Sequence, residues 1–219
     1  MDSRWTGADA ARLRIVEHPD LSATLVHFVD RGREPGPGVP ADIREMDAEQ
    51  RLTAILQQGS ITPFMTFSQG FPALCMTEMS WAGLDFMISS RGYRPWALMF
   101  DRQAVYDAGG GPVWYARPAE YAALAETPAL RSWAVRWSPD SEWVEEREWR
   151  VPRRPDSQGR AAPISLAELG LCGVIIDEPD WSCPALSPFG DGSCPEHWVD
   201  AVGELPRYWW EGQQLVRVG

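Results

Sequence analysis

The stretch Glu142-Trp143-Val144-Glu145-Glu146-Arg147-Glu148-Trp149-Arg150-Val151-Pro152 places carboxylates in a segment with the pattern of a buried strand. In an extended strand side chains alternate between faces, so Glu146 and Glu148 are expected to share one face. Two neighbouring carboxylates repel each other, and folded proteins tolerate them where a cation, a hydroxyl or a developing positive charge is met. The pair therefore predicts a functional site. The alternative is a solvated edge strand whose glutamates are neutralised by Arg147 and Arg150.

The charged residues narrow the range of functions. All 20 basic residues are arginine, which excludes a pyridoxal Schiff base, a Walker A loop and a kinase-type lysine. The net charge of −11 opposes nonspecific attraction to nucleic acid or to an anionic membrane. A local cluster of arginines could still hold a pyrophosphate or balance the nearby glutamates, and its members are Arg147, Arg150, Arg153 and Arg154.

Length and composition predict a single domain over residues 1–219. The chain is 44% hydrophobic and 23% charged, as in ordinary globular proteins, and its 12 tryptophans must pack in a core or line a cleft for flat rings. No apolar run approaches the roughly 20 residues that span a bilayer, and residues 1–5 lack a signal-peptide pattern. We therefore expect a cytoplasmic protein that does not insert into a membrane.

The four cysteines are Cys75, Cys172, Cys183 and Cys194, and they contain no CxxC pair. We expect them to be reduced and structural. Cys183, Cys194 and His197 could supply three metal ligands, but their spacing is irregular, so no metal is assigned to the predicted site.

The pattern of apolar residues predicts an α+β fold, with a central mixed or antiparallel sheet and flanking helices. A helix is predicted at residues 42–58, with Gly59 as its stop, and shorter helices at 121–125 and 164–169. A long loop is predicted at about 178–206. Strands are predicted at residues 21–30, 73–78, 96–100, 112–116, 142–151, 171–177 and 208–218.

The order of these segments resembles a known group of bacterial proteins. The pieces that carry the resemblance are the His27 strand, Ile55-Leu56-Gln57-Gln58-Gly59-Ser60-Ile61, Cys75-Met76-Thr77-Glu78, Phe100-Asp101-Arg102, Pro112-Val113-Trp114-Tyr115 and Glu146-Arg147-Glu148-Trp149-Arg150. From about residue 25 to 177 the chain resembles AbiGi-type abortive-infection proteins and, more distantly, DarT-type ADP-ribosyltransferases. The resemblance implies a split central sheet, NAD as a substrate, and a role in phage defence or a toxin–antitoxin pair.

The resemblance also implies roles for three residues. In ADP-ribosyltransferases a histidine or arginine on the first core strand anchors the NAD ribose, which matches His27, and a later glutamate serves the reaction centre, which matches Glu148. Cleavage of the bond to nicotinamide builds positive charge on the ribose, so a carboxylate at the 2′-hydroxyl stabilises the transition state. Glu146 completes a Glu-x-Glu arrangement and would orient or deprotonate the incoming nucleophile.

Further cofactor-binding candidates are Phe28, Thr77, Glu78, Arg94, Arg102 and Tyr115. The guanidinium groups of Arg94 and Arg102 match a diphosphate, although Arg102 could instead pair with a carboxylate at a strand end. Glu78 could face the cleft, cap the next helix or pair with a nearby arginine. Tyr115, like Tyr93 and Trp96, could stack on nicotinamide or adenine, whereas Phe28 has the character of a core residue.

Three functions remain open from the sequence. The first is an NAD-dependent ADP-ribosyltransferase that modifies a nucleic acid or a protein. The second is a catalytically inactive antitoxin or sensor, whose acidic charge would complement a basic protein partner. The third is a hydrolase of NAD or another nucleotide, in which the same carboxylates activate water.

Overall fold

The computed structural model describes residues 22–32, 39–66, 70–140, 143–183, 202–212 and 214–218. An eight-stranded sheet runs through this part of the chain in the order β12-β11-β10-β4-β1-β3-β8-β5. Neighbouring strands are antiparallel except β10 and β11, which are parallel, so the predicted α+β fold with a large mixed sheet is confirmed. The strands are β1 Thr24–Phe28, β3 Ala73–Thr77, β4 Ala97–Asp101, β5 Gly111–Pro112, β8 Glu148–Pro152, β10 Leu171–Ile176, β11 Arg207–Trp210 and β12 Leu215–Val218.

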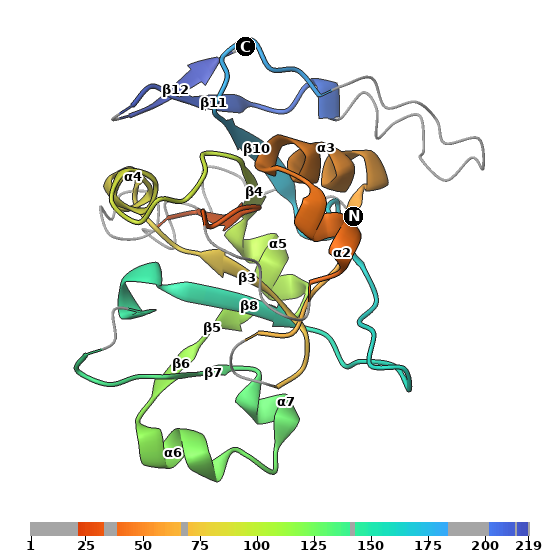
Figure 1. Ribbon diagram of the computed structural model, residues 1–219, viewed down its shortest axis with the longest axis vertical. Helices are drawn as coiled ribbons and strands as arrows, with labels where there is room; N and C mark the ends of the chain where they lie inside the picture. The colour runs from red at the N-terminus through yellow and green to blue at the C-terminus, as the bar shows by residue number, and fades with distance from the viewer. Residues whose placement is uncertain are drawn as a thin grey trace.

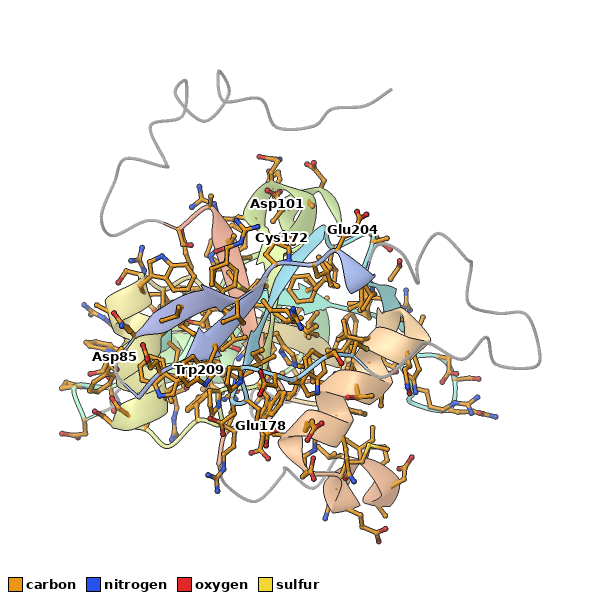
Figure 2. All side chains as sticks on the ribbon, turned by 90° about the horizontal axis from the view of Figure 1, so that it is seen from above. Asp85, Asp101, Cys172, Glu178, Glu204 and Trp209 are labelled. Carbon is orange, nitrogen blue, oxygen red and sulfur yellow. The ribbon has the colours of Figure 1, made fainter. Side chains whose placement is uncertain are left out.

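Helices cover both faces of this sheet, because alternate residues of the central strands are apolar on both sides. On the first face, Val26 and Met99 pack against helix α4, Trp81–Ser89. On the second face, Leu25 and Phe100 pack against α3, Ala48–Gln58, and α5, Arg102–Asp107. Seen from above, α4 with Asp85 and α3 lie on opposite sides of the sheet (Figure 2).

Capping residues determine where the helices begin and end. The predicted helix at 42–58 is divided into α2, Ala41–Glu45, and α3, because Asp47 forms a capping box with Gln50 and so begins a new helix. Gly59 ends α3 in the left-handed conformation, with φ 62°, as predicted. Helices α4 and α5 were not predicted. They begin where the side chains of Ser80 and Asp101 accept hydrogen bonds from backbone N–H groups.

Two other predicted elements have a different structure. The helix predicted at 164–169 is the short strand β9, Ile164–Ser165, followed by a turn, and β9 pairs with β2, Ser60–Ile61. The single strand predicted at 208–218 is the β11–β12 hairpin. Of the predicted loop at 178–206, only 178–183 and 202–206 lie among the described residues; Cys194 and His197 lie outside them. Within the described ranges, no helix combines the length and the apolar character needed to cross a bilayer.

A small lobe, residues 113–137, is inserted between β5 and β8. It contains β6 Trp114–Ala116, α6 Pro118–Ala123, α7 Pro128–Arg131 and β7 Ala134–Arg136, with β6 and β7 parallel. The lobe and the β11–β12 hairpin lie at opposite ends of the molecule (Figure 1). The Arg150 side chain of β8 donates to the carbonyls of Ser132 and Ala134, at 2.7 and 3.3 Å, and so fastens the lobe to the sheet.

Strands β1 and β3 are joined through a single residue pair, Val26 with Thr77. The eight strands therefore form one hydrogen-bonded sheet rather than two separate sheets, with a narrow junction at its centre. Beyond this pair the two strands diverge. The imidazole of His27 lies where these two strands diverge, and its Nδ1 donates to the carbonyl of Cys75 at 2.7 Å.

Candidate functional site

A cavity of about 20 Å³ lies on the first face of the sheet, where β1 and β3 diverge. Its volume admits about one water molecule. Both apolar and ionisable side chains reach it, so it is a candidate for chemistry as well as for packing. The cavity is lined by Val26, Phe28, Arg31, Cys75, Met76, Thr77, Met87, Tyr93 and Glu146.

Glu146 reaches this cavity from a turn that precedes β8. The segment Trp143–Glu146 is a 3-10 turn, η1, Arg147 has a left-handed backbone with φ 43°, and β8 begins at Glu148. The prediction of a strand at 142–151 is therefore wrong for residues 143–147, while residue 142 lies outside the described residues. Strand β3 ends at Thr77, which is paired with Glu148, the first residue of β8. The chain that precedes Glu148 bends away from the line of β8 beside this end of β3. There the Thr77 hydroxyl donates to the Glu146 carbonyl and the Glu78 N–H donates to the Arg147 carbonyl.

The Glu146 carboxylate lies between a phenol and a guanidinium. The Tyr93 hydroxyl donates to Glu146 Oε1 at 2.9 Å, and Arg31 Nη1 lies 3.8 Å from Oε2. The Arg31 guanidinium also lies 5.8 Å from the centre of the Tyr93 ring. Burial alone would lower the pKa of Arg31, but the electrostatic effects of Glu146, Tyr93, Cys75 and Glu148 together outweigh burial, and the pKa is raised. Arg31 is therefore a permanent cation beside Glu146.

The Glu148 carboxylate is held in a different way. Arg150 Nε lies 2.8 Å from Glu148 Oε1 and Nη2 lies 3.1 Å from Oε2, which makes a bidentate pair. The two side chains are only 5% and 10% exposed. Such a pair has a fixed geometry and, once formed, is costly to break. Glu148 and Arg150 are two residues apart on one strand and share its first face, so they can meet.

Tyr115 and Cys75 complete the polar surroundings. Glu148 N–H donates to the Tyr115 hydroxyl oxygen at 2.9 Å. Burial raises the pKa of Tyr115 to about 12, and the charges of Glu148 and Glu146 also raise it, so both carboxylates act on this phenol. Burial, followed by the charge of Glu148, raises the pKa of the Cys75 thiol. The thiol therefore stays protonated at neutral pH, which argues against a thiolate nucleophile.

The structure brings together some of the predicted residues. Glu146, Thr77 and Phe28 line the cavity, and Phe28 packs edge-on against Tyr93 at 5.1 Å between ring centres. Glu148 and Tyr115 lie next to it. His27 does not line the cavity; its ring is half-buried behind the wall that Cys75 forms.

The other predicted residues lie elsewhere. Glu78 pairs with Arg102 and also accepts a hydrogen bond from Trp149 Nε1 at 2.9 Å, on the second-face side of the sheet. Arg102 is thus the partner of a carboxylate at a strand end, the alternative that the sequence left open. Arg94 has an exposed side chain.

Sequence reasoning missed Arg31 as a site residue. It follows β1 in a segment with no periodic pattern, so no sequence signal marked it. Its position is instead set by a contact between two turns: a β-carbon on Gly32 would lie 2.0 Å from the Gly92 carbonyl oxygen, and Arg94 N–H donates to the Asp30 carbonyl at 3.2 Å. The contact holds Arg31 above Tyr93.

We expect Gly32→Ala to lower the free energy of unfolding by about 2–4 kcal/mol, because the methyl group meets the Gly92 oxygen and φ is +65°. Gly92→Ala is the matched control, since φ is +74° but its β-carbon would have no neighbour within 4 Å. For that variant we expect a loss of about 1 kcal/mol, from backbone strain alone. Urea unfolding measures both values, and equal losses would contradict the described contact.

The stability of the protein should also depend on His27. Burial and then the charge of Arg31 lower the pKa of His27 from 6.5 to about 4, although the hydrogen bond to Cys75 opposes them. Between these pH values the unfolded chain binds a proton that the folded protein does not, so stability falls as the pH falls through this window and is constant above it. For a half-buried ring we expect a loss of about 1–3 kcal/mol.

The control for this pH dependence is His27→Asn, whose amide can still donate to Cys75 but does not titrate. Urea unfolding on either side of the window should show the wild type losing more stability than the variant. Equal losses would mean that His27 is not the residue responsible.

Comparison with protein-family models, with curated proteins and with solved structures gives no match. The chemistry of the site therefore follows from its own residues. It offers two carboxylates, each beside an arginine, and two phenols, around a cavity at the centre of the sheet. Such a set can stabilise positive charge and bind hydroxyl groups; among the described residues, no cluster of metal-ligating side chains accompanies it.

Proposed function

We propose that this chain is an NAD-dependent ADP-ribosyltransferase that acts in the cytoplasm on a nucleic acid or protein, within a phage-defence or toxin–antitoxin pair. The observation that carries the proposal is the convergence of Glu146 and Glu148 with Tyr93 and Tyr115 at the diverging strands. The resemblance of the segment order to abortive-infection proteins and ADP-ribosyltransferases supports the same function.

The geometry suggests how the two carboxylates divide the work. Both oxygens of Glu148 are hydrogen-bonded to Arg150. Glu148 therefore acts on a substrate only through the long-range effect of its charge, and its ion pair with Arg150 keeps the site in position. Glu146 has one oxygen bonded to Tyr93 and the other 3.8 Å from Arg31, beyond hydrogen-bond distance. We therefore assign the contact with the ribose hydroxyl, which the resemblance gave to Glu148, to Glu146, where it would stabilise the positive charge that develops as nicotinamide leaves.

NAD cannot enter the cavity as it stands. The cavity measures about 20 Å³, whereas pockets for ligands of this size measure about 300–1,000 Å³. One of the contacts that close it joins Arg31 to Glu146 at 3.8 Å, and the Arg31 side chain is 35% exposed. Binding therefore begins with Arg31 swinging away from Glu146, which opens the cavity toward solvent.

A second candidate is a catalytically inactive partner protein that binds a basic protein through its acidic surface. It is favoured by the pairing of the carboxylates, since Glu146 and Glu148 already have cationic partners and the cavity admits only water. In this alternative the two ion pairs serve stability alone. The net charge of −11 would then guide association with the basic partner.

Thermal unfolding with and without NAD tests the proposal. A ligand that binds only the folded state raises the melting temperature, and NAD at ten times its Kd should raise it by about 3–5 °C for a chain of this size. Arg94→Gln is the control, because this exposed arginine lies outside the cavity, and it should keep the full shift. Arg31→Gln weakens the contact that closes the cavity and should therefore increase the shift. No shift in the wild type would contradict the transferase and favour the inactive partner.

A further inference from the structure

Arg147 has an unusual backbone for its residue type. Among the described residues that are not glycine, it alone has a positive φ, 43°. In this conformation the β-carbon of an L-residue approaches the following carbonyl oxygen, so glycine and asparagine are preferred there. An arginine in this conformation stores local strain. Strain of this kind is often found at functional sites, and Arg147 stands between the two site glutamates.

The left-handed residue changes the direction of the chain. An extended residue at 147 would carry Glu146 straight on along β8, beyond Thr77, the last residue of β3. Instead the chain turns into η1, where the Thr77 hydroxyl holds the Glu146 carbonyl and the Glu78 N–H holds the Arg147 carbonyl. These bonds fix the backbone on both sides of the turn, and the Glu146 side chain reaches Tyr93.

We propose that Arg147 is a positioning residue whose left-handed backbone directs the Glu146 carboxylate across the cavity, between Tyr93 and Arg31. The role belongs to the backbone conformation and not to the charge of the guanidinium. Its catalytic consequence rests on the proposed transferase function, whereas its structural consequence can be measured alone. Glycine or asparagine at 147 should preserve the arrangement, and valine, which is β-branched, should disrupt it.

The structural consequence can be followed through Cys75, which lines the same cavity as Glu146. In a Cys172→Ser, Cys183→Ser, Cys194→Ser background, the rate at which a disulfide reagent labels the partly buried Cys75 reports how accessible the cavity is to the reagent. We expect Arg147→Gly, Arg147→Asn and the charge control Arg147→Gln to stay within about twofold of the parent, and Arg147→Val to be labelled about tenfold faster. Fast labelling of the glycine and glutamine variants would assign the effect to the guanidinium and overturn the proposal, as would slow labelling of the valine variant.

Steady-state kinetics test the catalytic consequence. Arg147→Val should lower kcat for NAD turnover about tenfold with a smaller change in KM, while Arg147→Gly stays within about threefold of wild type. If the wild type does not turn over NAD, the proposed function fails, but the labelling rates still decide the role of Arg147. Melting temperatures are measured first. If Arg147→Val does not fold, Arg147→Ala takes its place, with labelling faster than that of Arg147→Gly as the expected result.

Discussion

Replacement of Glu146 by glutamine is expected to slow the release of nicotinamide from NAD by about 10²- to 10³-fold. The neutral amide cannot stabilise the positive charge that develops on the ribose, although it can still accept the hydrogen bond from Tyr93. The change preserves the size of the side chain and should leave the fold intact. Nicotinamide release, measured by chromatography at saturating NAD, gives the rate.

Glu145→Gln is the matched control for this experiment. It removes the same charge from the neighbouring residue, whose side chain is 49% exposed and pairs with Arg91 on the surface. We expect its rate to stay close to that of the wild type, because exposed ion pairs contribute little. Equal rates for Glu146→Gln and the wild type would exclude Glu146 from the reaction.

The second large effect concerns stability. Glu148→Gln is expected to lower the free energy of unfolding by about 3–5 kcal/mol, because it removes the negative charge that neutralises the buried Arg150 cation. Urea denaturation measures the loss. Glu168→Gln is the control, since Glu168 pairs with Arg153 but is 51% exposed, and there we expect a loss of no more than about 1 kcal/mol.

A paired replacement separates the ion pair from other effects of the substitution. In Glu148→Leu with Arg150→Met both charges are removed together, and the double variant should lose less stability than the sum of the single variants. Additive losses would show that the two side chains do not interact. This loss of stability also affects the choice of catalytic test. Activity lost in Glu148→Gln would reflect a weakened fold as much as a missing catalytic group, so replacement of Glu146 is more informative.

Local sequence patterns predicted most of the central sheet. The apolar runs of β1, β3, β4 and β10 and the stop at Gly59 depend on residues close together in the chain, so their patterns are visible in the sequence. Helix α4 was missed because apolar residues lie on several of its sides, including the exposed Trp81 and Phe86, and no single stripe marks it. The capping box at Asp47 was also visible in the sequence, but the continuous helical pattern masked it.

The site depends more on contacts between distant segments. The left-handed conformation of Arg147 could not be predicted, since arginine has no preference for it. Arg31 reaches Glu146 only because the turns at Gly32 and Gly92 touch, and Arg150 is fixed by lobe carbonyls that lie 18 and 16 residues earlier in the chain. The Glu148–Arg150 pair is different, because residues two apart on a strand share a face. That contact could have been predicted from the sequence.

The most direct test of the proposed function is to incubate the wild type and Glu146→Gln with NAD in the presence of protein and nucleic-acid acceptors. Nicotinamide release is measured together with the mass of the acceptors. We expect that the wild type releases nicotinamide and adds an ADP-ribosyl group to one class of acceptor, whereas Glu146→Gln does neither. Release without addition to any acceptor would indicate an NAD hydrolase. Folded wild-type protein that releases no nicotinamide with any acceptor would contradict the proposed transferase function.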